Sequence, residues 1–254
     1  MGSLIRSSII QGSFFIAVLN EFLFLGFTFF LFGITLLAFR LGLFALFALI
    51  GVSSVLMNIF VTKQFFLFGF AITGGNALYG SLFLATDLIG EHYGKRESLQ
   101  AVGIGFFASL FFVICSQVLL AFTPNEYDFA QDSLITLFSV TPRILFGSLL
   151  AFAIAQTLDV FLFQKIKILT KEQLPFLRNN LSTMFSQMVD TLIFTFVGLT
   201  SFSLWGIAFP GILETDLFWE VATATFLIKI LVALLDTPFF YWGYRGRKKM
   251  IKMV

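Results

Sequence analysis

The amino-acid sequence predicts an all-α protein, a polytopic integral membrane bundle of about seven transmembrane helices. Only 12% of its 254 residues are charged, whereas soluble domains carry about 25%. So few polar side chains cannot cover a water-facing surface, and lipid is therefore expected to surround much of the chain. The 38 Phe residues lack the strict alternation of a membrane β-strand, which favours helices over a barrel.

Seven apolar segments are long enough to cross the hydrocarbon core, which needs about 20 residues as a helix. They are Phe14–Phe39, Leu41–Phe60, Phe65–Ile89, Leu99–Phe122, Leu134–Phe163, Phe176–Leu199 and Leu217–Tyr241. The first two must fold back at Arg40 to Gly42, because a single helix of that length would reach roughly 70 Å. The glycine- and proline-containing stretch from Thr200 to Leu213 is expected to be an interfacial connection, with Trp205 at headgroup depth.

The charges between the segments predict an N-terminus outside and a cytoplasmic C-terminus. Bases follow the third, fifth and seventh segments: Lys95 and Arg96, then Lys165, Lys167 and Lys171, then Arg245, Arg247, Lys248, Lys249 and Lys252. The alternating connections hold acids and no bases: Glu126, Asp128 and Asp132, then Glu214, Asp216 and Glu220. Cytoplasmic loops are rich in Lys and Arg, so the basic connections are assigned to the cytoplasm. Arg6 and Lys63 are exceptions.

Asp190 is the most informative charge, because it lies near the middle of the sixth segment. An ionisable group at that depth costs about 2.5–3.5 kcal/mol and marks function by default. Ser182 and Ser186 share its helical stripe, and the adjacent stripe carries Thr183, Gln187 and Thr191. This polar face is expected to line a cavity, and hydrogen bonding between packed helices is the alternative.

Two carboxyl groups end the third segment. Asp87 and Glu91 are four residues apart and therefore lie on one helical face, beside His92. They form a cation site, a proton relay, or an ion pair in which Lys95 is the partner of Glu91.

Four more charges lie in the later segments and need partners. Arg143 and Asp159 are about 24 Å apart along the fifth segment, so they cannot pair with each other. Arg178 begins the sixth segment and either snorkels to the headgroups or pairs with an acid. Lys229, deep in the seventh, is expected to neutralise either Asp190 or Asp159.

Enzyme signatures are missing from the sequence. It contains no HExxH, Walker or GxSxG pattern, and its single His and single Cys exclude a conventional His/Cys metal cluster. No catalytic residue, metal site or cofactor is therefore predicted. The net charge of +2 gives no reason to expect direct nucleic-acid binding.

The residues just described resemble the queuosine precursor transporter family. The resemblance is carried by Phe83 to Lys95 (FLATDLIGEHYGK), Thr141 to Arg143, Ala155 to Val160, Arg178 to Thr183, Ser186 to Phe194, and by Asn58, Lys63, Lys229, Thr237 and Pro238. The blocks occur in order from about residue 50 to 243. The family has a core of about six helices, so residues 1–40 look like an extension with an added helix. Residues 41–243 would be the transporter core, and 244–254 a basic cytoplasmic tail.

The resemblance implies import of a 7-deazaguanine across the inner membrane of a bacterium, for salvage into tRNA. The candidates are 7-cyano-7-deazaguanine, 7-aminomethyl-7-deazaguanine and queuine. Asp190 and Gln187 are expected to read the base edge, with Asn58 and Ser186 as further substrate contacts. Gating or ion-pair roles are expected for Asp87, Glu91, Arg143, Asp159, Arg178 and Lys229.

Three other functions stay open at this point. The chain is alternatively the substrate-capture subunit of an energised vitamin or nucleobase importer, an intramembrane enzyme that uses Asp87 and Glu91, or a purely structural membrane protein. The sequence also leaves open which deazapurine is carried, whether transport is proton symport or facilitated diffusion, which aromatic ring stacks on the substrate, and whether the chain forms a homo-oligomer.

Overall fold

The computed structural model describes residues 2–138, 142–204, 207–209 and 213–251. Within them, six helices are long and apolar enough to cross a membrane. These are α1 (Gly2–Leu41, apolar from Val18), α2 (Leu43–Phe60), α4 (Lys95–Ala121), α6 (Pro142–Leu169), α7 (Pro175–Ile193) and α8 (Phe218–Ile251). A π-helical turn, Phe194–Leu199, extends α7. The prediction of a polytopic helical membrane protein is thus confirmed.

The prediction that the third span is a single helix was wrong. Its first residues form a hairpin of β1 (Gln64–Leu67) and β2 (Phe70–Thr73), in which Leu67 pairs with Phe70. The two turn residues, Phe68 and Gly69, have φ of 50° and 82°, as a tight hairpin turn requires. The helix α3 (Gly75–His92) begins only after this hairpin. A short apolar run fits a strand as well as it fits a buried helix. Hydropathy alone therefore could not distinguish the hairpin from the start of a helix.

The fifth predicted span also starts differently. The short helix α5 (Gln131–Phe138) covers its first residues, and α6 then begins at Pro142. Proline suits the first turn of a helix because it lacks an N–H that would have no partner there.

The expected interfacial connection contains strands. A second hairpin of β3 (Phe202–Leu204) and β4 (Ile207–Phe209) lies there, and a short 3-10 helix (Thr215–Leu217) leads into α8. Trp205 lies outside the described residues.

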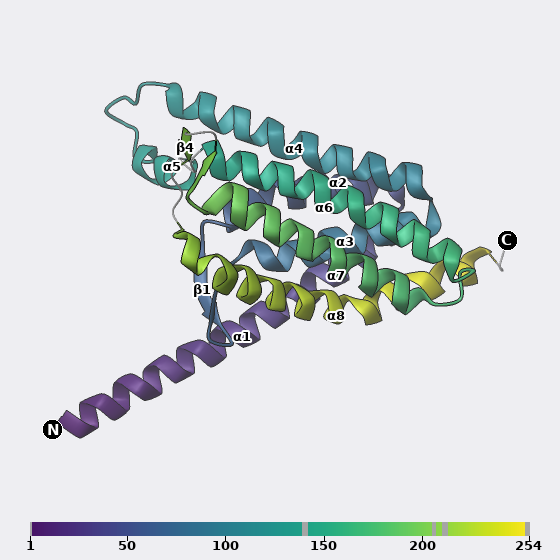
Figure 1. The fold of residues 1–254 in the computed structure, drawn as a ribbon, viewed down its shortest axis with the longest axis horizontal. Coiled ribbons are helices and arrows are strands. Elements are labelled where there is room, and N and C mark those ends of the chain that lie inside the picture. Colours follow the sequence, from purple (N-terminus) through teal and green to yellow (C-terminus); the bar gives the residue numbers. More distant parts are fainter. Residues whose placement is uncertain (1, 139–141, 205–206, 210–212, 252–254) are drawn as a thin grey trace.

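The bundle has two chemically different ends (Figure 1). Both hairpins and α5 lie at one end, which we call the hairpin end. The other end, which we call the basic end, is where α4 and α7 begin and where α6 and α8 finish. The connections rich in Lys and Arg lie at the basic end, and the acidic connections lie at the hairpin end.

The helix α3 lies in the interior of the bundle. It contacts α1, α2, α4, α6 and α8, and nearly all of its residues are buried. On the α1 side, Thr35 donates a hydrogen bond to Ser81 (3.3 Å), and Phe32 is fully buried. The helix α1 also holds the first hairpin, because Glu21 accepts a hydrogen bond from the backbone N–H of Phe68 (3.3 Å). Described side chains of α1 are therefore part of the packed structure.

Gly80 permits the close approach of α3 and α8. A Cβ atom at this position would lie 2.3 Å from Cγ1 of Val232 and 3.2 Å from the ring of Phe32. We therefore expect Gly80→Ala to destabilise the protein by about 1–3 kcal/mol, the usual cost of overpacking. The melting temperature of the detergent-purified protein measures this effect.

A second glycine provides the matched control. A Cβ atom added to Gly103, on α4, would meet nothing within 4 Å, so Gly103→Ala should leave the melting temperature unchanged or raise it. Combining Gly80→Ala with Val232→Ala should recover part of the lost stability. Equal melting temperatures for Gly80→Ala and Gly103→Ala would contradict the close-packing explanation.

Candidate functional site

Polar side chains of α3, α7 and α8 meet in a narrow crevice inside the bundle. The crevice is lined by Asn76, Tyr79, Gly80, Thr183, Gln187, Lys229, Val232 and Ala233. Its walls lie so close together that essentially no room is left for a water-sized sphere. Pockets that hold small molecules usually measure about 300–1,000 Å³. The crevice must therefore widen before a small-molecule ligand can enter.

An ion pair between α7 and α8 forms one wall of this region. Lys229 donates to Oδ2 of Asp190, and the side chains are only 5% and 1% exposed. Its ammonium group also lies 4.4 Å from the centre of the Tyr79 ring, a cation–π distance. The sequence left Asp190 and Asp159 open as partners of Lys229, and the structure pairs it with Asp190. Each charge is buried, so each depends on the other for compensation.

Several buried side-chain oxygens on the adjoining stretch of α7 have no partner. Within the described part of the chain, Oδ1 of Asp190, Oε1 of Gln187 and Oγ1 of Thr191 make no hydrogen bond. Leaving a buried polar group unsatisfied costs about 1–3 kcal/mol. Because Gln187 and Asp190 are one helical turn apart, their unpartnered oxygens point to a ligand that brings hydrogen-bond donors.

A second group of acids lies near the crevice and is called the carboxylate cluster below. It consists of Asp87 on α3, Asp159 on α6 and Asp236 on α8, each no more than 2% exposed. The three acids lie along one helix, because donors within two turns of α7 each bind one of them. Sequence reasoning placed Asp87 and Asp159 among the functional residues but missed Asp236.

Neutral side chains of α7 bind the carboxylate cluster. Ser186 donates to Oδ1 of Asp159 (3.1 Å), Thr183 to Oδ2 of Asp87 (3.5 Å) and Asn179 to Oδ1 of Asp236 (2.8 Å). Ser186 was predicted as a substrate contact, yet its hydroxyl faces the cluster. Thr183 contacts both the cluster and the crevice.

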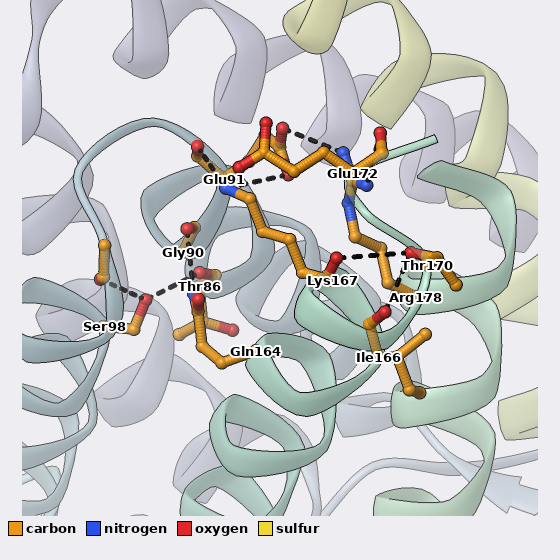
Figure 2. A network of polar contacts seen from close by, with 11 residues as sticks. Thr86, Gly90, Glu91, Ser98, Gln164, Ile166, Lys167, Thr170, Glu172 and Arg178 are labelled. Atoms are coloured by element: carbon orange, nitrogen blue, oxygen red, sulfur yellow. Dashed lines mark hydrogen bonds and ion pairs between the residues drawn. The ribbon is translucent and has the colours of Figure 1, made fainter. Parts of the chain in front are cut away.

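An ion-pair network lies at the basic end (Figure 2). Arg178 Nη2 is 2.8 Å from Oε1 of Glu91, and Lys167 Nζ is 3.5 Å from its Oε2. Arg178 is fully buried, so it does not snorkel to the headgroups. Lys95, expected as a partner of Glu91, instead places its ammonium group 3.6 Å from the centre of the Phe161 ring.

Side chains in the same network bind backbone carbonyls at the end of α3 and in the connection between α6 and α7. Lys167 donates to the carbonyl of Glu91 (2.9 Å), Gln164 to that of Gly90 (2.9 Å), and Arg178 to that of Glu172 (3.2 Å) (Figure 2). These bonds join the end of α3 to α6 and to the connection between α6 and α7. The network therefore holds these elements together at the basic end.

Two predicted residues lie away from the crevice. Arg143 donates to the carbonyls of Val197 (2.7 Å) and Phe196 (3.3 Å), in the π-helical turn after α7. Asn58 donates to the carbonyl of Ser54 (2.8 Å) and to Ser109 (3.4 Å), which joins α2 to α4. The contacts of Arg143 satisfy carbonyls at a helix end, and those of Asn58 join two helices.

Sequence reasoning missed the α3 wall of the crevice. Asn76, Tyr79 and Gly80 have spacings of three and four residues and therefore share one helical face. That spacing around a glycine was visible in the sequence. It became informative only once the helix was known to begin at Gly75.

Comparisons with known proteins agree with this architecture. The family described as "Putative vitamin uptake transporter" matches residues 73–243, which include most of every helix that lines the crevice or carries the carboxylate cluster. The "Probable queuosine precursor transporter" of Bacillus subtilis (strain 168) is 40% identical over 211 residues, 83% of this chain and 86% of that protein. No solved structure matches the chain. The family resemblance is thus confirmed: the chain belongs to the vitamin uptake transporter family, and it is a membrane transporter rather than an enzyme.

Proposed function

We propose that this protein imports a queuosine precursor, a 7-deazaguanine, across the inner membrane of a bacterium. The similarity to the Bacillus subtilis protein extends over most of both chains. The observation that carries the proposal is the pair of unpartnered oxygens on Asp190 and Gln187, next to the crevice. A guanine-like base presents adjacent N–H donors, and these are the groups that the two oxygens lack.

The proposed binding mode uses three side chains. The free oxygen of Asp190 and the amide of Gln187 read the base edge, and such contacts are worth about 1–3 kcal/mol of discrimination. Lys229 stays paired with the other carboxylate oxygen of Asp190. Tyr79, across the crevice, stacks on the base, which is worth a further 1–3 kcal/mol or so. Asn58 and Ser186 act indirectly, through the helix contacts described above.

We further propose that the hairpin end faces outward and that the basic end is cytoplasmic. The distribution of Lys and Arg between the loops supports this orientation. The interior helix α3 would then complete a seventh pass, and α1 would be an addition to a core of residues 41–243. In this orientation the network of Glu91, Arg178 and Lys167 closes the cytoplasmic side of the substrate path.

Restoration of queuosine in tRNA tests the proposed function. The host lacks both deazaguanine synthesis and its own importer, carries the maturation enzymes suited to each precursor, and expresses this chain alone. 7-Cyano-7-deazaguanine, 7-aminomethyl-7-deazaguanine and queuine are supplied separately. Restoration by at least one of them is expected, and it would also argue against a capture subunit that needs an energising partner. Failure with all three, despite confirmed membrane expression, would reject the proposal.

Substitutions of Tyr79 test the stacking contact. We expect Tyr79→Ala to raise the half-saturating substrate concentration for uptake by about 5- to 150-fold, the equivalent of 1–3 kcal/mol. Tyr79→Phe keeps the aromatic ring and should change this concentration much less. Tyr127→Ala removes an exposed tyrosine from the loop before α5 and serves as the control. Equal effects of Ala and Phe at position 79 would contradict a stacking role.

A further inference from the structure

The carboxylate cluster has no cation of its own. The buried cations among the described residues are Arg178 and Lys229, and they are paired with Glu91 and Asp190. In α1 from residue 18, α2 and α4, the buried polar side chains are all hydroxyls: Thr28, Thr35, Ser53, Ser54, Ser98, Ser109 and Ser116. Several ionised carboxylates cannot lie together in such an interior without compensation. At least one of the three acids must therefore carry a proton.

The hydrogen bonds that reach the cluster bring no compensating charge. Thr183 donates to Asp87, Ser186 to Asp159 and Asn179 to Asp236, so the donors from α7 are two hydroxyls and an amide. Thr183 and Ser186 are three residues apart, and the two acids that they bind therefore lie along the same side of α7. Neutral donors stabilise a carboxylate less than a cation does, which favours a proton on one member of the pair.

Unpartnered atoms provide a second, independent observation. Within the described residues, Oδ2 of Asp159, Oδ2 of Asp236 and Oδ1 of Asn179 are buried and accept no hydrogen bond. The Asn179 side chain is fully buried and is directed at Asp236 by its Nδ2 donor. Spare acceptors in such a place indicate room for a further proton. No group of three or more His, Cys, Asp or Glu residues in the described chain has the arrangement to hold a metal ion.

Charged and titratable groups lie to two sides of the pair. Along α3, one turn from Asp87, are Glu91 with its partners Arg178 and Lys167, and then His92, whose ring is 4.8 Å from that of Phe39. On the crevice side are the paired Asp190 and Lys229, and Tyr79, whose ring centre lies 4.4 Å from the Lys229 ammonium group. The cluster thus lies between two compensated ion-pair groups.

We propose that the Asp87–Asp159 pair, with Asp236 beside it, is a proton-binding site that couples import of one proton to import of each substrate molecule. This proposal rests on the transport function proposed above. The proton binds from the outer side while the bundle is open outward. It is released to the cytoplasm after the substrate has left, which returns the pair to its starting state.

Thr183 connects the proton site to the substrate site. Its side chain lines the crevice, and its hydroxyl donates to Oδ2 of Asp87. One turn along α7, Gln187 lines the crevice while the adjacent Ser186 donates to Asp159. Any movement of α7 that widens the crevice for the base therefore also changes the donors around the two acids.

The experiment measures exchange and accumulation separately in proteoliposomes. The probes are the labelled forms of the three deazaguanines named above. Exchange of labelled for unlabelled probe needs no gradient and reports transport alone. Accumulation is then driven by an inside-alkaline pH gradient with the membrane potential clamped. One proton per substrate should give about tenfold accumulation per pH unit, because a tenfold ratio matches one unit of pH.

Neutral variants of the pair should separate the two quantities. Asp87→Asn and Asp159→Asn keep the side-chain shape and still supply a donor to the remaining acid. We expect exchange to persist in both variants and the accumulation ratio to fall to about one. Glu21→Gln is the matched control, because Glu21 is a carboxyl that binds the hairpin outside the cluster. It should accumulate substrate as the unchanged protein does.

Infrared difference spectroscopy supplies a readout that needs no substrate. A protonated carboxyl group has a carbonyl band that shifts when the detergent-purified protein is moved into D₂O. We expect this band in the unchanged protein and in Glu21→Gln, and a weaker band in both Asn variants. An unchanged band in the variants would overturn the assignment.

The remaining outcomes distinguish the two proposals. Exchange without any response to the pH gradient in the unchanged protein would overturn proton coupling and leave the transport function intact. Full accumulation in both Asn variants would also overturn it. If none of the three probes is exchanged, both the proposed transport and the coupling built on it are rejected.

Discussion

Asp190→Ala is expected to abolish uptake and to destabilise the protein strongly. It removes the acceptor proposed to read the base and leaves Lys229 as an unpaired cation inside the bundle. Breaking a buried ion pair by removing one partner typically costs 3–5 kcal/mol or so. Uptake of labelled precursor and the melting temperature of the purified protein measure the two effects. Normal uptake together with normal expression would reject the assignment of Asp190.

A double variant separates binding from folding. Asp190→Asn combined with Lys229→Gln leaves no buried charge at this position, so the melting temperature should recover toward that of the unchanged protein. Uptake should stay lost, because the carboxylate acceptor is still missing. Asp216→Ala, at an exposed position just before α8, is the control for simple loss of an acid. Recovery of uptake in the double variant would show that Asp190 serves the fold alone.

Arg178→Met is expected to have the second-largest effect. Arg178 is fully buried and lies 2.8 Å from Glu91, which would keep only the longer contact with Lys167. Loss of this partner should also cost about 3–5 kcal/mol. The melting temperature should therefore fall well below that of Lys95→Met, which removes a lysine that contacts the Phe161 ring at the same end.

The same network is proposed to close the cytoplasmic side, so it has a transport readout as well. Arg178→Met with Glu91→Gln removes both charges and should recover part of the stability. If the network is a gate, vesicles loaded with precursor should lose it faster through this double variant than through the unchanged protein. Equal rates of loss would limit the network to a structural role.

Much of the helical architecture was predictable because long apolar segments have few alternatives in a membrane. The hairpin from Gln64 to Thr73 was not, since its apolar residues satisfy a hydropathy window as well as a helix does. The Phe68-Gly69 turn is also an unusual pair, because phenylalanine rarely adopts a positive φ. Pro142, by contrast, could have been used to predict the start of α6, because proline is common in the first turn of a helix. The prediction from hydropathy did not use it.

The candidate site was predictable one helix at a time. The polar stripes of α7 follow from spacing alone, and they identified Asp190, Gln187 and Ser186. Partners from other helices carry no such signal. Lys95, four residues from Glu91, was the expected ion-pair partner. Arg178, 87 positions further along the chain than Glu91, forms the ion pair instead. Asp236 and Tyr79 joined the site for the same reason, because only the packing of α3 and α8 against their neighbours brings them there.

The enclosure of α3 also bears on how the protein is made. The translocon sorts segments into lipid by hydrophobicity, and α3 carries Asn76, Asp87 and Glu91 with no lipid-facing side to offset them. It does not reach the hydropathy of the six spanning helices around it. Stable insertion of α3 therefore depends on α1 and α2, which are synthesised before it, and is completed when α6 and α8 emerge from the ribosome and cover its charges. Biogenesis of this transporter is thus a cooperative process rather than a series of independent insertions.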